Sequence, residues 1–201
     1  MESVIIVLNN KIDIPISDYD YVGVESGAVA LLDKNIPIKF AIGDFDSVSL
    51  DDKKRLEEKC EEFILLAEEK DCTDSEAAIK ECIKRGYENI FILGALGKRV
   101  DHELVNLKLV MEYPQDIILY NENNRIMALP EGEYEIEKDD YQYISFFAKD
   151  TAIISLEGFK YPLSDTTITS KDIYTVSNEI VEDKGRLSIK EGIVLVIQSK
   201  D

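Results

Sequence analysis

Three acid-rich segments recur in the first half of the chain, and each directly follows an apolar run typical of a buried β-strand. They are Gly43–Ser47, Lys70–Asp74 and Gly94–His102. In an open parallel α/β sheet the strands end at one edge, and ligands bind in the crevice there. We therefore expect several carboxylates, Lys98 and Arg99 to meet in one site. Such a site can hold a divalent cation and a polyphosphate together.

Asp44 and Asp46 are the first pair of carboxylates in this arrangement. In extended backbone, residues two apart point to the same side, so both should face the crevice while Phe45 packs inward. At about 4 Å and an effective dielectric near 20, two such charges repel by about 4 kcal/mol. Mg²⁺ offsets that repulsion and is typically held by one or two carboxylates plus phosphate oxygens. The alternative is that both are turn residues capping the next helix; Asp71 and Asp74 at the same edge favour the metal.

The segment Asp71–Glu76 has a structural explanation as well as a functional one. Thr73 and Glu76 have the spacing of a capping box, and Asp74 is an acid in the first helical turn. Capping accounts for Thr73 and Glu76 in full. Asp71 and Asp74 exceed what a cap requires, so we expect them to serve the metal, Asp74 serving the cap as well.

The segment Gly94–Arg99 carries two glycines, a lysine and an arginine after a strand. It is not a Walker A loop, which needs four residues between its glycines. Glycines still let the backbone approach an anion closely, and Arg99 has a fork suited to phosphate oxygens. Asp101 could orient Arg99 or accept a hydrogen bond from a substrate hydroxyl. His102, at a helix start, is interpreted as a structural hydrogen-bonding residue.

The elements that must position these segments change in character along the chain. Before residue 121, apolar runs alternate with amphipathic ones, which predicts a parallel α/β unit. The expected strands are Ser3–Leu8, Tyr21–Val24, Ile38–Ile42, Phe63–Ala67, Asn89–Leu93 and Asp116–Tyr120, with helices beginning after Ser49, after Thr73 and near His102.

After Tyr120, short alternating runs follow one another between turn residues. The expected strands are Arg125–Leu129, Tyr143–Phe147, Ala152–Leu156, Ile173–Val176, Arg186–Lys190 and Ile193–Ile197. This pattern predicts an antiparallel β domain. The predicted fold is an α/β N-terminal domain with a mostly parallel sheet flanked by helices, residues 1–122, followed by an all-β sandwich-like C-terminal domain, residues 123–201.

The composition narrows the functional classes. The chain has 201 residues, of which 45% are hydrophobic and 32% charged, as in a folded globular protein. A net charge of −18 argues against non-specific binding to nucleic acid or to an anionic membrane. Three cysteines and one histidine make a structural zinc site improbable, and free thiols without a signal-peptide pattern predict a cytoplasmic protein.

In this order and spacing, the segments resemble the thiamine pyrophosphokinase family. Gly43–Ser47 resembles its acidic signature, Asp71–Asp74 its D-x-T-D element, and Gly97–His102 with Asn106 its G-G-R-x-D-H…N segment. Gly158–Leu163 and Ser177–Glu179 are similar to its K-Y-P-L and S-N-E elements. One such motif would be weak evidence, but five in order are specific.

The resemblance implies transfer of pyrophosphate from ATP to the hydroxyl of thiamine, with release of AMP, by a homodimer whose active site lies at the subunit interface. The implied roles, listed by position, are Mg²⁺ binding by Asp44, Asp46, Asp74 and Glu25; catalysis by Asp71, Arg99 and Asp101; ATP binding by Lys98, Arg99, Gly97, Ser47 and Thr73; and thiamine binding by Ser177, Asn178, Asp101 and His102. Ser177 and Asn178 would reach the site from the other subunit.

Two departures from the family pattern keep alternatives open. The family usually has Asp-Gly-Gly where this chain has Glu25-Ser26-Gly27, and Lys98 replaces a common glycine. One alternative is another ATP-dependent phosphotransferase or hydrolase acting on a different small molecule. A second is a catalytically inactive dimer that binds thiamine or a nucleotide. A purely structural dimer would leave the repulsion among the acidic residues unexplained. No residue stands out as a general base, with Asp101 and Asp71 as the candidates.

Overall fold

The computed structural model describes residues 2–9, 11–69, 71–97, 99–114 and 116–201. The chain divides into two compact units, Met1–Asn106 and Leu107–Asp201. The division falls within helix α4, Val100–Glu112. A domain boundary at residues 122 and 123 stays a prediction.

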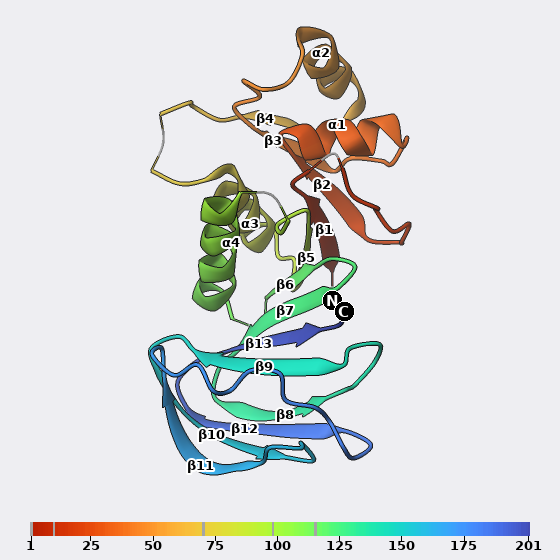
Figure 1. Ribbon diagram of the computed structural model, residues 1–201. Coiled ribbons are helices and arrows are strands. Elements are labelled where there is room, and N and C mark those ends of the chain that lie inside the picture. The colour runs from red at the N-terminus through yellow and green to blue at the C-terminus, as the bar shows by residue number, and fades with distance from the viewer. Residues whose placement is uncertain (1, 10, 70, 98, 115) are drawn as a thin grey trace. The chain divides into compact units, whose positions relative to one another are not determined.

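The first unit contains a parallel sheet with the strand order β4-β3-β2-β1-β5 (Figure 1). Every neighbouring pair among these strands runs parallel. Their bounds are β1 Ser3–Val7, β2 Asp20–Val24, β3 Phe40–Gly43, β4 Phe63–Leu65 and β5 Asn89–Leu93. The predicted parallel α/β unit is thus confirmed, and the carboxyl ends of its strands meet at one edge.

Three helices join these strands, α1 Ser26–Asp33, α2 Leu50–Lys59 and α3 Asp74–Lys84, and α4 follows β5. Two of the predicted starts are confirmed by their caps. The Ser49 hydroxyl accepts from the Asp52 N–H at 3.1 Å, and the Thr73 hydroxyl accepts from the Glu76 N–H at 3.2 Å. Helix α1 was not predicted, because it has only eight residues and follows Glu25 without a side-chain cap.

The core of the first unit forms around alternating strand residues. Ile5, Val7 and Tyr21 pack with the buried faces of α1 and α2, which include Leu31 and Leu56. Since successive strand residues point to opposite faces, the sheet also buries its other face, where α3 contacts β2 and β3. Burial on both faces explains why these strands are nearly continuous apolar runs.

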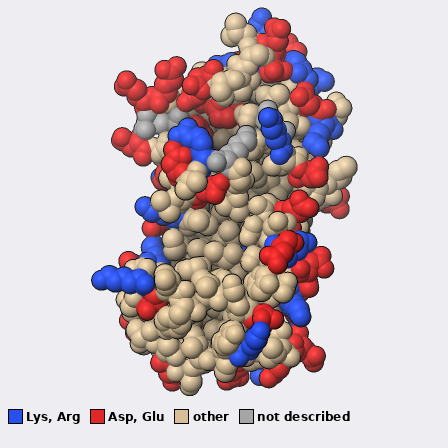
Figure 2. Space-filling model, in the orientation of Figure 1, with Lys and Arg blue, Asp and Glu red and all other residues tan. Residues whose placement is uncertain are grey.

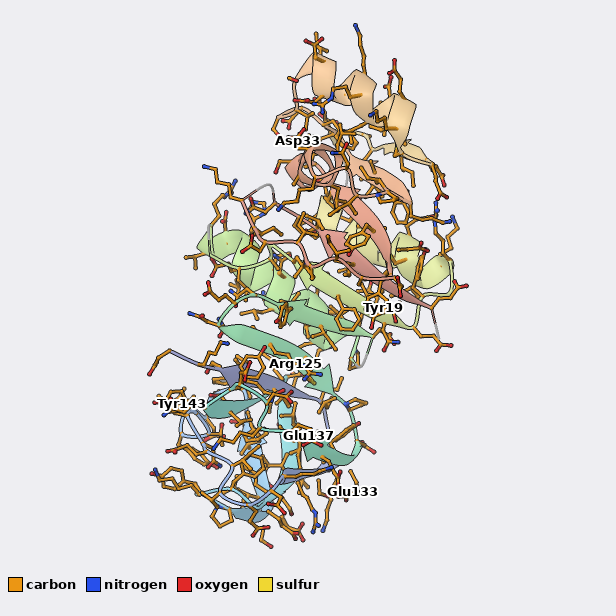
Figure 3. All side chains as sticks on the ribbon, turned by 90° about the vertical axis from the view of Figure 1, so that its right-hand side faces the viewer. Tyr19, Asp33, Arg125, Glu133, Glu137 and Tyr143 are labelled. Atoms are coloured by element: carbon orange, nitrogen blue, oxygen red, sulfur yellow. The ribbon has the colours of Figure 1, made fainter. Side chains whose placement is uncertain are left out.

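Two contacts join separate segments of this unit, one between two helices and one between a loop and a strand. Figure 3 labels one residue of each contact. Asp33, at the end of α1, accepts a hydrogen bond at 3.1 Å from Arg55 of α2. Tyr19, in the segment before β2, stacks on Phe91 of β5 with ring centroids 5.6 Å apart.

The second unit is a sandwich of two antiparallel sheets, as predicted. The strand orders are β6-β7-β13-β9 and β11-β10-β12-β8. The bounds are β6 Ile117–Tyr120, β7 Asn124–Leu129, β8 Gly132–Ile136, β9 Tyr143–Ala148, β10 Thr151–Glu157, β11 Leu163–Thr169, β12 Gly185–Glu191 and β13 Val194–Ser199. Side chains from both sheets form one core, in which Phe146 of β9 meets Phe159 edge-on at 5.5 Å.

Three details of the second unit differ from the sequence predictions. Ile173–Val176 is not a strand; Ile173, Tyr174 and Val176 are exposed, and only Thr175 is buried. Strands β8 and β11 were missed. Both lie at the edges of their sheet and carry mostly polar residues, as exposed edge strands often do. The hydrophobic pattern of the sequence therefore does not predict β8 or β11.

The surface charge matches the composition. On the face shown in Figure 2, acidic residues are spread widely, and the basic residues lie among them as separate groups. Within the described ranges, each helix is too short or too polar to span a membrane.

Candidate active site

A cavity of about 410 Å³ opens in the first unit where strands end and helices begin. Its lining residues follow β1, β2, β3 and β5 or lie at the starts of α3 and α4. They are Leu8, Asn9, Val24, Glu25, Ser47, Thr73, Asp74, Ser75, Gly94, Ala95, Leu96, Arg99, His102, Glu103 and Asn106. The three sequence segments singled out by their chemistry therefore contribute to one pocket.

Three carboxylates lie together beside this pocket. Glu25, Asp44 and Asp46 each offer an oxygen, and these oxygens lie within 4.8 Å of one another. Glu25 and Asp44 are half-buried, and Asp46 is exposed. Mg²⁺ prefers oxygen ligands, and it keeps open positions for water and substrate phosphates. The donor set therefore fits a hard divalent cation.

Glu25 also holds the loop that carries the two aspartates. Its Oε1 accepts from the Phe45 N–H at 2.7 Å, and its Oε2 accepts from the Ser47 hydroxyl at 3.4 Å. The close approach requires Gly43, because a Cβ there would lie 2.0 Å from Oε1. One side chain thus connects the end of β2 to the loop after β3.

The loop reaches its shape by a route that differs from the prediction. Phe45 is not extended but has φ 55°, in the left-handed region. Its ring is buried and stacks on Phe63 of β4 at 4.6 Å. The predicted inward packing of Phe45 is confirmed, while the grouping of Asp44 and Asp46 arises from a tight turn around it rather than from extended backbone.

The negative charges of the site repel one another, and this repulsion affects the pKa of Glu25. Burial raises the pKa of Glu25 above its usual range, the Phe45 N–H partly opposes this, and the charges of Asp44, Asp74 and Asp46 raise the pKa further. Asp74 is outside the group of three but close enough to act on Glu25. A bound cation would relieve this repulsion, which is a second reason that the residues fit a metal.

The second segment divides between the pocket and the solvent. Asp74, the first residue of α3, lines the cavity together with Thr73 and Ser75. Asp71 is exposed in the preceding turn. Within the part of the chain that the structure describes, Asp71 belongs neither to the group of three carboxylates nor to the pocket wall.

The third segment places Arg99 and His102 in the pocket wall. Arg99 pairs with Asp101 through two hydrogen bonds, from Nε at 3.1 Å and from Nη2 at 2.5 Å. The Arg99 guanidinium lowers the pKa of Asp101 to about 2, with a further contribution from the His102 N–H. The Arg99 side chain is 71% exposed, so its cation is accessible to a phosphate. Lys98, predicted to bind ATP, lies outside the described residues.

The two C-terminal motif segments meet in the second unit. The Asn178 amide donates to the Tyr161 carbonyl at 2.8 Å and accepts from the Tyr161 N–H at 3.0 Å. Asn178 is 5% exposed, whereas Ser177 is exposed and donates its N–H to Ser145 Oγ. A small cavity of about 40 Å³ beside them is lined in part by Tyr161 and Tyr174.

The sequence predictions assigned no role in the site to Asn9 or Glu103, and they named Asn106 only as part of the G-G-R-x-D-H…N segment. All three line the pocket, and Asn9 and Asn106 are buried polar residues. The signal for Asn9 was present, since it directly follows the expected strand Ser3–Leu8 as the other site residues follow their strands. No pattern in the sequence indicated Glu103.

Two thiamin pyrophosphokinase domain families match this chain in order. The model of the thiamin pyrophosphokinase catalytic domain matches residues 18–121, and that of the thiamin pyrophosphokinase vitamin B1 binding domain matches residues 133–194. Thiamine pyrophosphokinase of Bacillus subtilis (strain 168) is 37% identical over 187 residues, which cover 90% of this chain and 87% of that protein.

Solved structures agree with these matches. The crystal structure of thiamine pyrophosphokinase from Bacillus subtilis superposes with a TM-score of 0.89 at 33% identity, covering 100% of both chains. A thiamin pyrophosphokinase family protein from Enterococcus faecalis superposes with a TM-score of 0.90 at 31% identity, again over 100% of both chains. With both family models matched in order and a pocket of the expected chemistry, this chain belongs to the thiamin pyrophosphokinase family.

Proposed function

We propose that this enzyme transfers the terminal pyrophosphate of ATP to the hydroxyl group of thiamine and releases AMP. One observation carries the proposal: Glu25, Asp44, Asp46 and Asp74 converge beside a pocket that also contains Arg99. In a protein with a net charge of −18, an anionic substrate needs local cations to bind. A metal on the carboxylates and the guanidinium of Arg99 supply them.

Glu25, Asp44 and Asp46 would hold Mg²⁺, with Asp74 adding negative charge nearby. When bound, the ion would neutralise charge on the polyphosphate and orient it. Glu25 has a second task that does not depend on the ion, because its hydrogen bond to the Phe45 N–H fixes the loop between the two aspartates.

The reaction is an in-line displacement at the β-phosphorus of ATP. The thiamine hydroxyl oxygen forms a bond to this phosphorus, the bond to the bridging oxygen between the α- and β-phosphorus breaks, and AMP leaves with that electron pair. The hydroxyl proton passes to solvent. Pyrophosphoryl transfer, like phosphoryl transfer, requires mainly positioning and charge neutralisation from the protein.

Arg99 and Asp101 have distinct tasks in this step. Arg99 binds the negative charge that develops on the transferring group. Asp101 orients the guanidinium through two hydrogen bonds. Because Arg99 lowers the pKa of Asp101 to about 2, Asp101 is a weak proton acceptor at neutral pH. Asp101 thus suits orientation of Arg99 and of the thiamine hydroxyl better than proton removal.

The remaining substrate contacts are proposed on the same basis. Thr73, Ser47 and Lys98 would contact the nucleotide, and His102 would lie near thiamine. Ser177 would contact thiamine from the second subunit of a homodimer, and the buried Asn178, whose amide bonds Tyr161, would support that side of the thiamine site rather than contact thiamine itself. Three free cysteines support the cytoplasm as the working compartment.

Product analysis tests the proposal directly. The purified protein is incubated with ATP, Mg²⁺ and thiamine, and nucleotides and thiamine esters are separated by chromatography. We expect AMP and thiamine diphosphate in equal amounts. Formation of ADP or free phosphate would favour another phosphotransferase or hydrolase. Tight binding without AMP would favour an inactive binding protein. Light scattering with and without substrates tests the homodimer.

A further inference from the structure

The loop Gly94–Gly97 is tied to helix α4 by two side chains. The Glu103 Oε1 accepts from the Gly97 N–H at 2.8 Å. The Asn106 amide donates to the Ala95 carbonyl at 2.9 Å. Glu103 and Asn106 are three residues apart and so lie on the same helix face. Together they bond one donor and one acceptor of the same loop.

This loop contains two glycines, whose backbone conformation is restricted less than that of other residues. Contacts with other parts of the chain must therefore hold the loop in one shape. Gly94 and Gly97 have φ of +79° and +95°, which glycine adopts without steric strain. Fixing a glycine in one conformation nevertheless costs more backbone entropy than fixing another residue. Gly94 is packed, since a Cβ there would lie 2.6 Å from Asn9 Cβ. Gly97 has nothing within 4 Å of its Cβ position. Packing fixes the first glycine, and the hydrogen bond to Glu103 restrains the second.

Glu103 is bonded to Arg99 as well as to the loop. Arg99 lies two residues after Gly97, and its carbonyl accepts the Glu103 N–H at 3.0 Å in the first turn of α4. Glu103 therefore contacts the chain on both sides of position 98, through its carboxylate at Gly97 and its N–H at Arg99. Ala95, Leu96 and Arg99 all line the pocket.

We propose that Glu103 is a positioning residue for nucleotide binding, which holds the Gly94–Gly97 loop in the shape that presents Arg99 to the phosphates. The ligand it serves rests on the proposed function. The Gly97 N–H is bonded to a carboxylate, so it acts as a structural donor rather than as a phosphate donor. This revises the role of Gly97 predicted from the sequence.

Two variants separate positioning from charge. Glu103→Ala removes the acceptor, and Glu103→Gln keeps an acceptor oxygen without the charge. Glu112→Ala is the matched control, because Glu112 ends the same helix and pairs with Lys149 at 2.9 Å, away from the pocket-lining residues. The measurements are exchange of the Gly97 amide hydrogen by NMR, ATP affinity with Mg²⁺ by calorimetry, and KM and kcat for each substrate.

In Glu103→Ala we expect the Gly97 amide to exchange about tenfold faster and ATP to bind about tenfold more weakly, as for loss of one charge-assisted hydrogen bond. The KM for ATP should rise while that for thiamine stays within about twofold. Glu103→Gln should recover most of both losses, and Glu112→Ala should match the wild type.

Two outcomes would overturn the proposal. If both Glu103 variants bind ATP more tightly than the wild type, the carboxylate opposes the phosphates by its charge and does not position the loop for them. If neither the Gly97 exchange rate nor ATP affinity changes in Glu103→Ala, the hydrogen bond does not hold the Gly94–Gly97 loop in its binding shape. A wild-type protein that binds ATP but forms no thiamine diphosphate would instead count against the proposed function, because amide exchange and ATP affinity are measured without thiamine.

Discussion

The motif residues differ in burial and hydrogen bonding between two regions, the acidic pocket of the first unit and the Ser177–Asn178 segment of the second unit. Asp46, beside the pocket, and Arg99, in its wall, are exposed. Glu25 bonds the loop that carries Asp46, and Glu103 bonds the Gly94–Gly97 loop that precedes Arg99. In the second unit, Asn178 is buried, and its amide bonds both backbone groups of Tyr161. A motif residue can thus be a ligand-facing group or the support of one.

This difference has a physical cause. A residue that binds a metal or phosphate must leave oxygen or nitrogen atoms available to the ligand, so its loop has to be fixed by other groups. A buried amide, in contrast, must satisfy its own donors and acceptors within the protein. Burial and hydrogen-bond partners therefore separate the two roles where motif matching does not.

Removal of a pocket carboxylate should have the largest effect. We expect Asp46→Asn to lower kcat by about 100-fold or more, because a ligand of the proposed metal loses its charge. The thermal midpoint of unfolding should change little, since Asp46 is exposed. Steady-state kinetics and calorimetry measure both. Asp51→Asn, an exposed site on α2, is the matched control, and full activity in Asp46→Asn would refute the metal assignment.

Truncation of Asn178 should act on stability instead. Asn178→Ala breaks two hydrogen bonds to Tyr161 in a buried position, which should lower the free energy of unfolding by about 2–3 kcal/mol. Urea unfolding measures this change. Ser177→Ala, at an exposed site, should stay within about 0.5 kcal/mol. If Asn178→Ala instead raises the KM for thiamine without loss of stability, Asn178 is a substrate ligand and the contrast fails.

Gly43→Ala tests the support of the acidic loop rather than its ligands. The new Cβ would lie 2.0 Å from Glu25 Oε1 and should displace that carboxylate from the Phe45 N–H. We expect about a tenfold higher Mg²⁺ concentration for half-maximal activity, as for loss of one charge-assisted hydrogen bond. Gly86→Ala is the control for backbone strain, because Gly86 also has a positive φ, +89°, but nothing lies within 4 Å of its Cβ position. Unchanged Mg²⁺ dependence would show that Glu25 does not support the site.

The smallest effect concerns pH. Arg99 lowers the pKa of Asp101 to about 2, so the ion pair is fully present above the ordinary Asp pKa and is lost only as the pH falls toward 2. Protonation of Asp101 therefore cannot cause a fall in kcat/KM between about pH 4 and 6. We expect Asp101→Asn to lower kcat/KM by the same factor across that range. An acid limb that disappears in Asp101→Asn would instead identify Asp101 as the proton acceptor.

Much of the fold follows from local patterns. The five parallel strands were predicted from apolar runs, and the starts of α2 and α3 from caps. Each of these signals is contained in a stretch of a few consecutive residues. Helix α1 was too short to predict, and the polar edge strands β8 and β11 are held by pairing with β12 and β10. Their residues carry little sign of that pairing.

The sequence by itself determined that acidic and basic residues follow successive strands, and that this order resembles one enzyme family. Only the tertiary structure decided that Glu25, Asp44 and Asp46 form one group with Asp74 outside it, that Asp71 is exposed to solvent, and that the Glu103 carboxylate bonds the Gly97 N–H. The first outcome depends on the left-handed turn at Phe45 and its stacking with Phe63, and the last depends on the hydrogen bond from the Gly97 N–H to Glu103. Glu25 and Phe63 are distant from Phe45 along the chain, and a side-chain bond from a helix to a backbone N–H leaves no pattern of residue types, so local spacing could not reveal these contacts.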